Sequence, residues 1–270
     1  MGFLVSVNSN GSLLRGELRE AVKQDPPLRF NITLYGGSNA TYERLCGRAM
    51  FQEVVDNLRA LKDAGIPVRL NVSVTPDNKD DVPEIFRLAR ELGLHTKAST
   101  YMYPPVRLDD GRPGDAPHRF APEDAARYML LCREQQFTLE ELRASAAGVP
   151  LSDGDECTGN AEGEPVLCRA GRSSFWLTWD GRMIPCGMMA SPGTPVLEQG
   201  FSAAWRSVRT EVEAIRLPAA CAGCALRRHC NLCAASCFAE TGDYDRKPDY
   251  ICSLTHTLCR ITREKYGTED

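Results

Sequence analysis

The stretch "IPVRLNVSVTPDNKDDVPEIFRLARELGL", residues 66–94, contains one strand followed by one helix. Residues 66–76 are rich in β-branched and apolar side chains, which predicts a strand. Residues 80–94 repeat their apolar side chains at helical intervals. The stretch is therefore a unit from which an α/β fold can be built.

Similar patterns occur on both sides of this unit. Strands are predicted at 2–11, 28–37 and 95–105, and helices at 13–24, 41–65 and 122–136. Gly65 is expected to stop the long second helix. Strands that alternate with helices through short connections indicate a parallel sheet covered by helices, either a barrel or a doubly wound layer.

Composition excludes several classes of partner. The chain has 270 residues, 43% hydrophobic and 25% charged, with a net charge of −4 and no basic stripe. Nucleic acid and membrane partners are therefore not expected. No apolar run approaches the ~20 residues of a membrane span, and the N-terminus lacks the features of a signal peptide. A cytoplasmic location is expected, where thiols stay reduced.

The cysteines are concentrated in one part of the chain. Cys46 and Cys132 precede position 157, and ten others lie between Cys157 and Cys259. A segment rich in Gly, Pro and small polar residues lies just before them. We place a domain boundary there, with a domain at 1–150 that includes the linking helix and a cysteine-rich domain at 151–270.

Clustered thiols in a reducing compartment indicate metal or redox chemistry. In "CAGCALRRHC" the short intervals allow one turning loop to deliver Cys221, Cys224 and Cys230 to an iron–sulfur cluster, with a fourth thiolate from elsewhere. A compact zinc site is the alternative, although zinc knuckles are usually separated by longer hairpins. Ten thiols exceed what one tetrahedral zinc needs. Cys46, Cys132 and Cys259 are interpreted as small apolar residues.

The cysteine spacing resembles a known family. Cys157 and Cys168 are followed by "AGRSSFWLTWDGRMIPC", which ends in the G-x4-C of Gly181 to Cys186, then by C-x2-C-x5-C, Cys233 and "YIC" at Cys252. Over about 100 residues this pattern is similar to the SPASM domain, the auxiliary-cluster domain of radical S-adenosylmethionine enzymes, many of which modify peptides.

The resemblance implies two four-iron clusters. One ligand set would be Cys157, Cys168, Cys186 and Cys233, and the other Cys221, Cys224, Cys230 and Cys252. The clusters would transfer electrons or anchor substrate. Because the family commonly has three residues before the thiol that Cys233 provides, and this chain has two, Cys237 competes for that position. The family's distribution of small residues favours Cys233.

The first domain resembles the third to sixth strands of the radical SAM (β/α) barrel in "VNSNGSLL", "ITLYGGSNATYERLCG", "VRLNVSVTPDN" and "YMYPPVR". The resemblance implies that Asn10, Thr33 and Asn71 offer polar groups to S-adenosylmethionine, although each can equally bond to its own loop. The "YGGS" turn at 35–38 has even odds of being a ligand contact or a tight turn.

The family's C-x3-C-x2-C motif, which holds the cluster that cleaves S-adenosylmethionine, is absent from this sequence. The first two barrel strands would also precede Met1. We expect either an N-terminally truncated enzyme or a relative that has lost its catalytic N-terminal part. The apolar edge that residues 3–7 would expose favours truncation. The chain alone is predicted to be inactive.

Three hypotheses follow. The first is the rear part of a radical SAM/SPASM oxidoreductase that modifies a peptide or protein and receives electrons from a donor such as ferredoxin or flavodoxin. The second is a non-catalytic iron–sulfur module for electron transfer or peptide binding. The third is a zinc-stabilised structural domain. The sequence does not identify the substrate or the bond that is altered.

Overall fold

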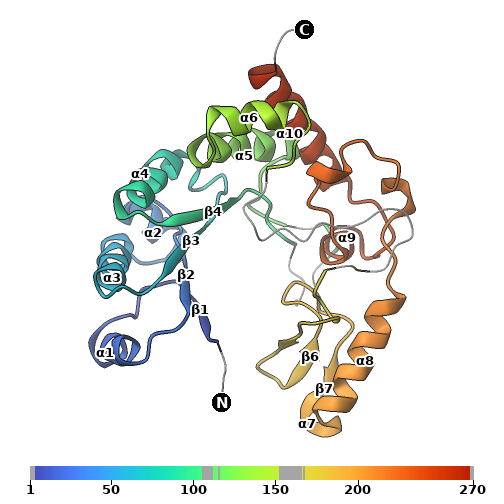
Figure 1. Ribbon diagram of the computed structural model, residues 1–270, viewed down its shortest axis with the longest axis horizontal. Helices are drawn as coiled ribbons and strands as arrows, with labels where there is room; N and C mark the ends of the chain where they lie inside the picture. The colour runs from blue at the N-terminus through green and yellow to red at the C-terminus, as the bar shows by residue number, and fades with distance from the viewer. Residues whose placement is uncertain (1–3, 105–111, 115, 152–165, 167, 268–270) are drawn as a thin grey trace. The chain divides into compact units, whose positions relative to one another are not determined.

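The computed structural model describes residues 4–104, 112–114, 116–151, 166 and 168–267 (Figure 1). The chain divides into two compact units. The first comprises residues 1–102 and 118–139, and the second comprises residues 103–117 and 140–270. Within the described part of the chain, no helix is both long and apolar enough to cross a membrane.

The first unit is built on a four-stranded parallel sheet in the order β1-β2-β3-β4. The strands are β1 (Ser6–Ser9), β2 (Arg29–Thr33), β3 (Val68–Ser73) and β4 (His95–Ser99). The helices are α1 (Gly16–Gln24), α2 (Asn39–Cys46), α3 (Phe51–Asp63), α4 (Val82–Leu92) and α5 (Pro122–Gln136), with a 3₁₀ turn, η1 (Lys79–Asp81), before α4. The alternation of strand and helix confirms the predicted α/β class with a parallel sheet.

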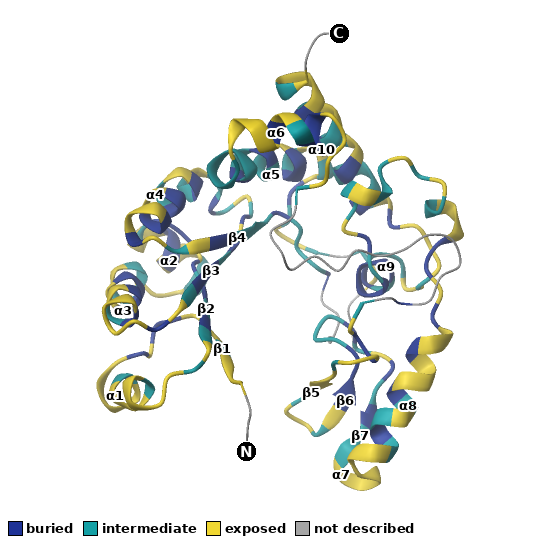
Figure 2. Cartoon of the chain, in the orientation of Figure 1, coloured by how far each residue is buried: buried dark blue, intermediate teal, exposed yellow. Residues whose placement is uncertain are grey.

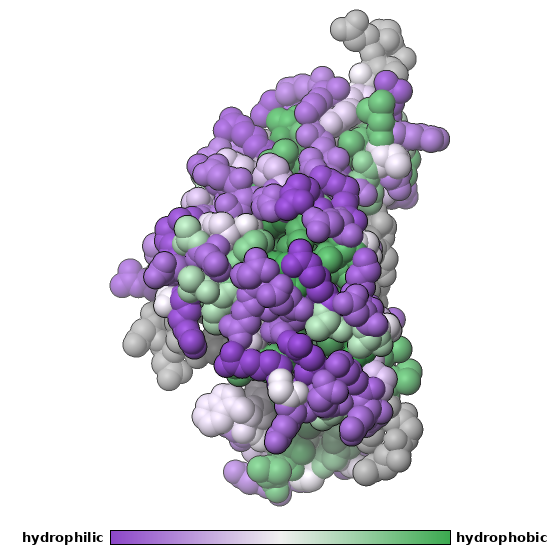
Figure 3. Space-filling view, turned by 90° about the vertical axis from the view of Figure 1, so that its left-hand side faces the viewer, coloured by the Kyte–Doolittle hydropathy of each residue, from purple (hydrophilic) through white to green (hydrophobic). Residues whose placement is uncertain are grey.

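Buried residues lie along the central strands of this sheet (Figure 2). Ile32, Leu34 and Leu70 are completely buried in the core, together with Val54 and Ile85 of the helices. Helices α1, α3 and α4 lie on the same side of the sheet (Figure 1). Their outer surface is mainly hydrophilic (Figure 3). Because side chains alternate along a strand, polar residues of β2 and β3 occupy the opposite face.

The predicted helix over 41–65 is wrong in one respect, because two helices occupy this range. Gly47 ends α2 in the left-handed conformation, with φ of 71°, and its N–H bonds to the carbonyl of Glu43. A new helix, α3, begins four residues later at Phe51. Glycine adopts positive φ without steric cost, so the backbone can turn at Gly47. The apolar periodicity of the sequence continues across this helix end and does not reveal it. The predicted stop at Gly65 is confirmed, since α3 ends at Asp63 and Gly65 has φ of 70°.

Two buried asparagines hold loops at the ends of the strands. The Asn78 amide donates to the carbonyls of Tyr35 and Ser73, both at 2.9 Å, and its oxygen accepts from the Thr75 N–H at 2.7 Å. In the same way, the Asn57 amide donates to the Gly11 carbonyl at 2.7 Å. These side chains satisfy backbone groups that the sheet leaves unpaired.

The second unit has a small antiparallel sheet in the order β5-β6-β7. Its strands are β5 (Trp176–Leu177), β6 (Arg182–Ile184) and β7 (Thr194–Pro195). Its helical segments are α7 (Val196–Gln199), α8 (Phe201–Ala214), η2 (Ala219–Cys221), η3 (Arg227–His229), α9 (Ala234–Thr241) and α10 (Asp249–Tyr266), and α6 (Leu139–Ala146) begins at the boundary of the units. Met183 of β6 and Val208 and Val212 of α8 belong to its apolar core.

Gly181 shapes the turn between β5 and β6. It has φ of 76°, and its N–H bonds to the Thr178 carbonyl at 3.0 Å. A Cβ at this position would lie 2.8 Å from a methyl carbon of Leu197. The turn therefore requires glycine for both its backbone conformation and its space. This is the glycine of the G-x4-C motif that leads to Cys186.

We predict that Asn78→Ala lowers the free energy of unfolding by about 2–3 kcal/mol, because it leaves buried N–H and C=O groups without partners. Urea unfolding followed by circular dichroism measures this change. The control is Asn8→Ala, which removes a bond between the exposed side chains of Asn8 and Asn31. Its cost should be below about 0.5 kcal/mol. Equal costs for the two variants would contradict the role of Asn78.

Candidate metal centre

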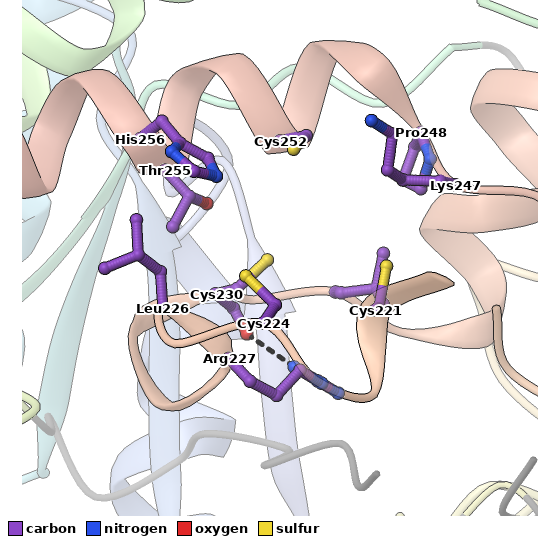
Figure 4. Close-up of a pocket in the computed structure, with 11 residues that line it drawn as sticks. Cys221, Cys224, Leu226, Arg227, Cys230, Lys247, Pro248, Cys252, Thr255 and His256 are labelled. Atoms are coloured by element: carbon purple, nitrogen blue, oxygen red, sulfur yellow. Dashed lines mark hydrogen bonds between the residues drawn. The ribbon is translucent and has the colours of Figure 1, made fainter. Parts of the chain in front are cut away.

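Four thiols line one pocket in the second unit (Figure 4). Cys221, Cys224 and Cys230 come from the loop between α8 and α9, and Cys252 comes from α10. The pocket encloses about 350 Å³ of empty space, part of which is open to solvent. These cysteines are the four that the sequence assigned to one ligand set.

The loop brings its three thiols together through repeated short turns. The Cys224 N–H bonds to the Cys221 carbonyl at 3.3 Å, the Arg227 N–H to the Cys224 carbonyl at 3.0 Å, and the Cys230 N–H to the Arg227 carbonyl at 3.3 Å. Each bond spans three residues, the spacing at which side chains of 3₁₀ turns lie above one another. The C-x2-C-x5-C spacing therefore places its members on one side of the loop.

The fourth thiol comes from the first turns of α10. Cys252, Thr255 and His256 all line the pocket, and their intervals of three and four place them on one face of the helix. Figure 4 shows this helix across the pocket from the cysteine loop. Ile251 and Leu258 are buried and anchor α10 in the unit.

The electrostatics of Cys221 indicate how closely these groups lie. Burial raises the pKa of the Cys221 thiol above its usual value. The neighbouring Cys230, Cys252 and Cys224 raise this pKa further, while the Arg227 guanidinium opposes them. The other three thiols of the pocket therefore all lie close enough to Cys221 to act on it.

Three members of the other ligand set lie around one apolar cluster. Cys168, Cys186 and Cys233 pack against the buried core that contains Met183 and Val208. The fourth, Cys157, lies outside the described residues. The three described cysteines of this set thus pack against the same apolar cluster.

Backbone and side-chain groups surround the sulfurs of this set. The Met188 N–H donates to Cys186 Sγ at 3.5 Å, and the Ser236 N–H donates to Cys233 Sγ at the same distance. Cys233 is the N-cap of α9, where its Sγ accepts the N–H of the third helical residue. Tyr103 Oη lies 3.9 Å from the same sulfur. Hydrogen-bonding groups therefore lie beside both sulfurs.

Cys237, the competing residue, has a different environment. Its side chain is completely buried in α9, and burial raises the pKa of its thiol far above the usual value. Nearby thiols, Cys233 first among them, raise this pKa further. A protonated, apolar thiol is therefore the favoured state of Cys237. Cys132 is similar, since burial raises its pKa to about 12.

The polar residues suggested for S-adenosylmethionine lie in the first unit. Thr33 and Asn71 are partners in the register of β2 and β3, and both are half-buried. Asn10 follows β1, and its side-chain oxygen accepts from the Ser12 N–H at 3.1 Å and from the Ser12 hydroxyl at 2.9 Å. The structure thus places Thr33 beside Asn71, while Asn10 bonds to its own loop.

The "YGGS" turn is explained by packing. The Gly37 N–H donates to Asp81 Oδ2 at 2.7 Å, and a Cβ on Gly36 would lie 2.5 Å from Thr41 Cγ2. Ser38 then caps α2 by accepting the Thr41 N–H. Close packing in the turn therefore explains why glycine occupies both positions.

Sequence reasoning did not include the other residues of the cysteine-lined pocket. Arg227, Lys247 and His256 are three basic side chains in its lining. The position of Arg227, midway between Cys224 and Cys230 at intervals of three, is the signal that could have identified it. Among the described residues, no group of three His, Cys, Asp or Glu side chains is arranged to hold a single metal ion.

Comparison with known proteins gives a family match over the first part of the chain. Residues 1–105 match the model of the Radical SAM superfamily. An AdoMet-dependent heme synthase of Methanosarcina barkeri is 23% identical over 262 residues, covering 92% of this chain and 74% of the relative. A probable GTP 3',8-cyclase of Saccharolobus islandicus is 30% identical over 92 residues, covering 34% of this chain and 30% of the relative.

Solved structures share the fold. A structure of anSMEcpe with bound AdoMet and the Kp18Cys peptide has a TM-score of 0.68 at 13% identity, covering 97% of this chain and 74% of that one. Streptococcus suis SuiB bound to S-adenosylmethionine has a TM-score of 0.59 at 14% identity, covering 92% and 58%. The fold is thus the α/β fold of radical SAM enzymes. The chain therefore resembles radical SAM enzymes in fold, and residues 1–105 match the model of that superfamily.

The environments of Cys233 and Cys237 give a direct prediction. After anaerobic reconstitution, Cys233→Ala should lose up to one cluster's iron, because alanine offers no ligand. Cys237→Ala should retain the iron of the unmodified chain, since it removes only a buried apolar group. Iron and acid-labile sulfide assays measure both. The reverse result, with iron lost only in Cys237→Ala, would make Cys237 the ligand.

Proposed function

We propose that this chain is the auxiliary-cluster part of a radical SAM/SPASM oxidoreductase. The second unit, with the sequence from about residue 151 onward, is a SPASM domain that holds two 4Fe–4S clusters. Cys221, Cys224, Cys230 and Cys252 bind one cluster. The other is bound by the set Cys157, Cys168, Cys186 and Cys233.

The observation that carries this proposal is the pocket lined by four thiols (Figure 4). Thiolates are the usual ligands of four-iron clusters, so the donor set fits this cofactor. Three ligands on one loop and a fourth on a distant helix are also the arrangement expected from the sequence. When bound, such clusters supply one-electron transfer.

The surrounding residues determine what reaches these clusters. The apolar core around Met183 packs against Cys168, Cys186 and Cys233, which limits the access of water to their sulfurs. Backbone N–H groups donate to the sulfurs of Cys186 and Cys233. The chain thus surrounds these sulfurs with hydrogen-bond donors in a partly dry environment.

The first unit is proposed to be part of a radical SAM barrel. Residues 1–105 match the superfamily model, and the AdoMet-bound relatives share the fold. The paired polar side chains of Thr33 and Asn71 are the proposed contacts to S-adenosylmethionine, with Asn10 at the end of the neighbouring strand. The family's cleavage reaction requires the C-x3-C-x2-C motif, which this sequence does not contain.

A peptide or protein is the proposed substrate. Two relatives with this fold were solved with bound peptides, anSMEcpe with Kp18Cys and SuiB with its precursor peptide SuiA. In this proposal, the substrate is modified oxidatively, and ferredoxin or flavodoxin exchanges electrons with the clusters.

Heme synthesis is a second candidate function. Two AdoMet-dependent heme synthases, from Methanosarcina barkeri and Nitratidesulfovibrio vulgaris, match 92% and 90% of this chain. Their identities of 23% and 22% extend over both units. A tetrapyrrole is therefore the alternative class of substrate.

Cluster content tests the proposal. The reconstituted chain should contain about eight irons and eight sulfides, from two four-iron clusters. Cys252→Ala should remove about half of this iron, because α10 then lacks its ligand. Cys259→Ala is the matched control, since Cys259 is also half-buried on α10 but does not line the pocket. Stoichiometric zinc without sulfide would contradict the proposal and favour a zinc-stabilised domain.

Heme titration separates the two substrate classes. If the substrate is a peptide, adding heme to the reconstituted chain should produce no saturable change in the Soret band at equimolar ratios. Saturable binding of one heme per chain would favour the tetrapyrrole candidate. The same titration of Cys252→Ala shows whether any signal depends on an intact pocket.

A further inference from the structure

The cysteine loop places a fourth side chain in phase with its three thiols. Cys221, Cys224, Arg227 and Cys230 follow one another at intervals of three, and backbone bonds at the same interval connect them. All four side chains line the pocket. The repeat that collects the thiols therefore also places Arg227 in the lining of the same pocket.

The hydrogen-bonding capacity of Arg227 is only partly used. Its Nη1 donates to the Cys230 carbonyl at 3.1 Å (Figure 4). Its Nε and Nη2 are buried and have no hydrogen-bond partner. Buried N–H groups almost always have acceptors, and their desolvation is costly without one. We therefore expect the Nε and Nη2 donors of Arg227 to bond to an acceptor that occupies the pocket.

The other basic residues of the pocket differ from Arg227. Lys247 Nζ lies 3.3 Å from Asp249 Oδ1, and the Lys247 side chain is 44% exposed. His256 is also exposed to solvent. Water screens charges at exposed positions, whereas buried charges act strongly. Among these three lining residues, Arg227 combines burial with unpaired donors.

We propose that Arg227 donates N–H hydrogen bonds to the sulfurs of the cluster held by Cys221, Cys224, Cys230 and Cys252, and thereby raises its reduction potential. The inference rests on the proposed function of the pocket. Reduction adds negative charge to the cluster, and a nearby cation with N–H donors stabilises the reduced form. Arg227 thus controls how easily this cluster is reduced.

Redox titration of the reconstituted full chain, followed by electron paramagnetic resonance, tests this role. Arg227→Gln should lower the midpoint potential of one cluster. A tenfold loss in the equilibrium constant for reduction corresponds to about 59 mV for a one-electron couple. The second cluster, with the other ligand set, should keep its potential and serves as an internal reference.

Two further variants separate geometry from net charge. Arg228→Gln removes the same charge from the next position, where the side chain is exposed, and should leave both potentials unchanged. Arg227→Lys retains the charge without the planar donor group, and should lower the potential by less than Arg227→Gln. If Arg227→Gln fails to retain the cluster, the potential of Arg227→Lys decides the question.

The outcomes distinguish this inference from the function on which it rests. An unmodified chain that holds no iron would contradict the proposed function itself. If the unmodified chain holds both clusters and the Arg227 variants keep their potentials, Arg227 has no such role. An equal shift in Arg228→Gln would attribute the effect to overall charge and overturn the proposed hydrogen bonds.

Discussion

A repeat of three-residue backbone hydrogen bonds, from Cys221 to Cys230, is the constraint on which the pocket depends. Each bond fixes the next turn, so side chains at this interval lie on one side of the loop. The loop is short and contributes little apolar burial of its own. Its geometry is thus set mainly by the backbone, and α10 supplies the opposite wall with Cys252.

The first unit depends on a different constraint, the hydrogen bonding of the loops at its strand ends. Parallel strands end at one edge of the sheet, and their loops need partners for backbone groups that no strand pairs. Asn78 and Asn57 provide these partners from buried positions. Because the bonds are internal, they fix the loops beside Thr33 and Asn71.

The sequence predicted the strand and helix order of the first unit well, since apolar periodicity reports which side of each element is buried. It missed the break at Gly47, where the periodicity continues although the backbone turns. The pairing of Cys252 with the distant loop came from family resemblance, because local patterns carry no information about contacts between remote segments. Arg227 was overlooked because arginine usually lies at the surface.

The position of the fourth pocket thiol has a consequence for how this unit is assembled. Three of the proposed ligands lie on one loop, but Cys252 follows only with α10. Closing the intervening loop costs entropy that metal ligation can offset. A complete site therefore exists only after α10 has been synthesised and has packed through Ile251 and Leu258. If the proposed cluster is bound here, the position of α10 depends on metal ligation, and loss of the metal would first loosen this helix.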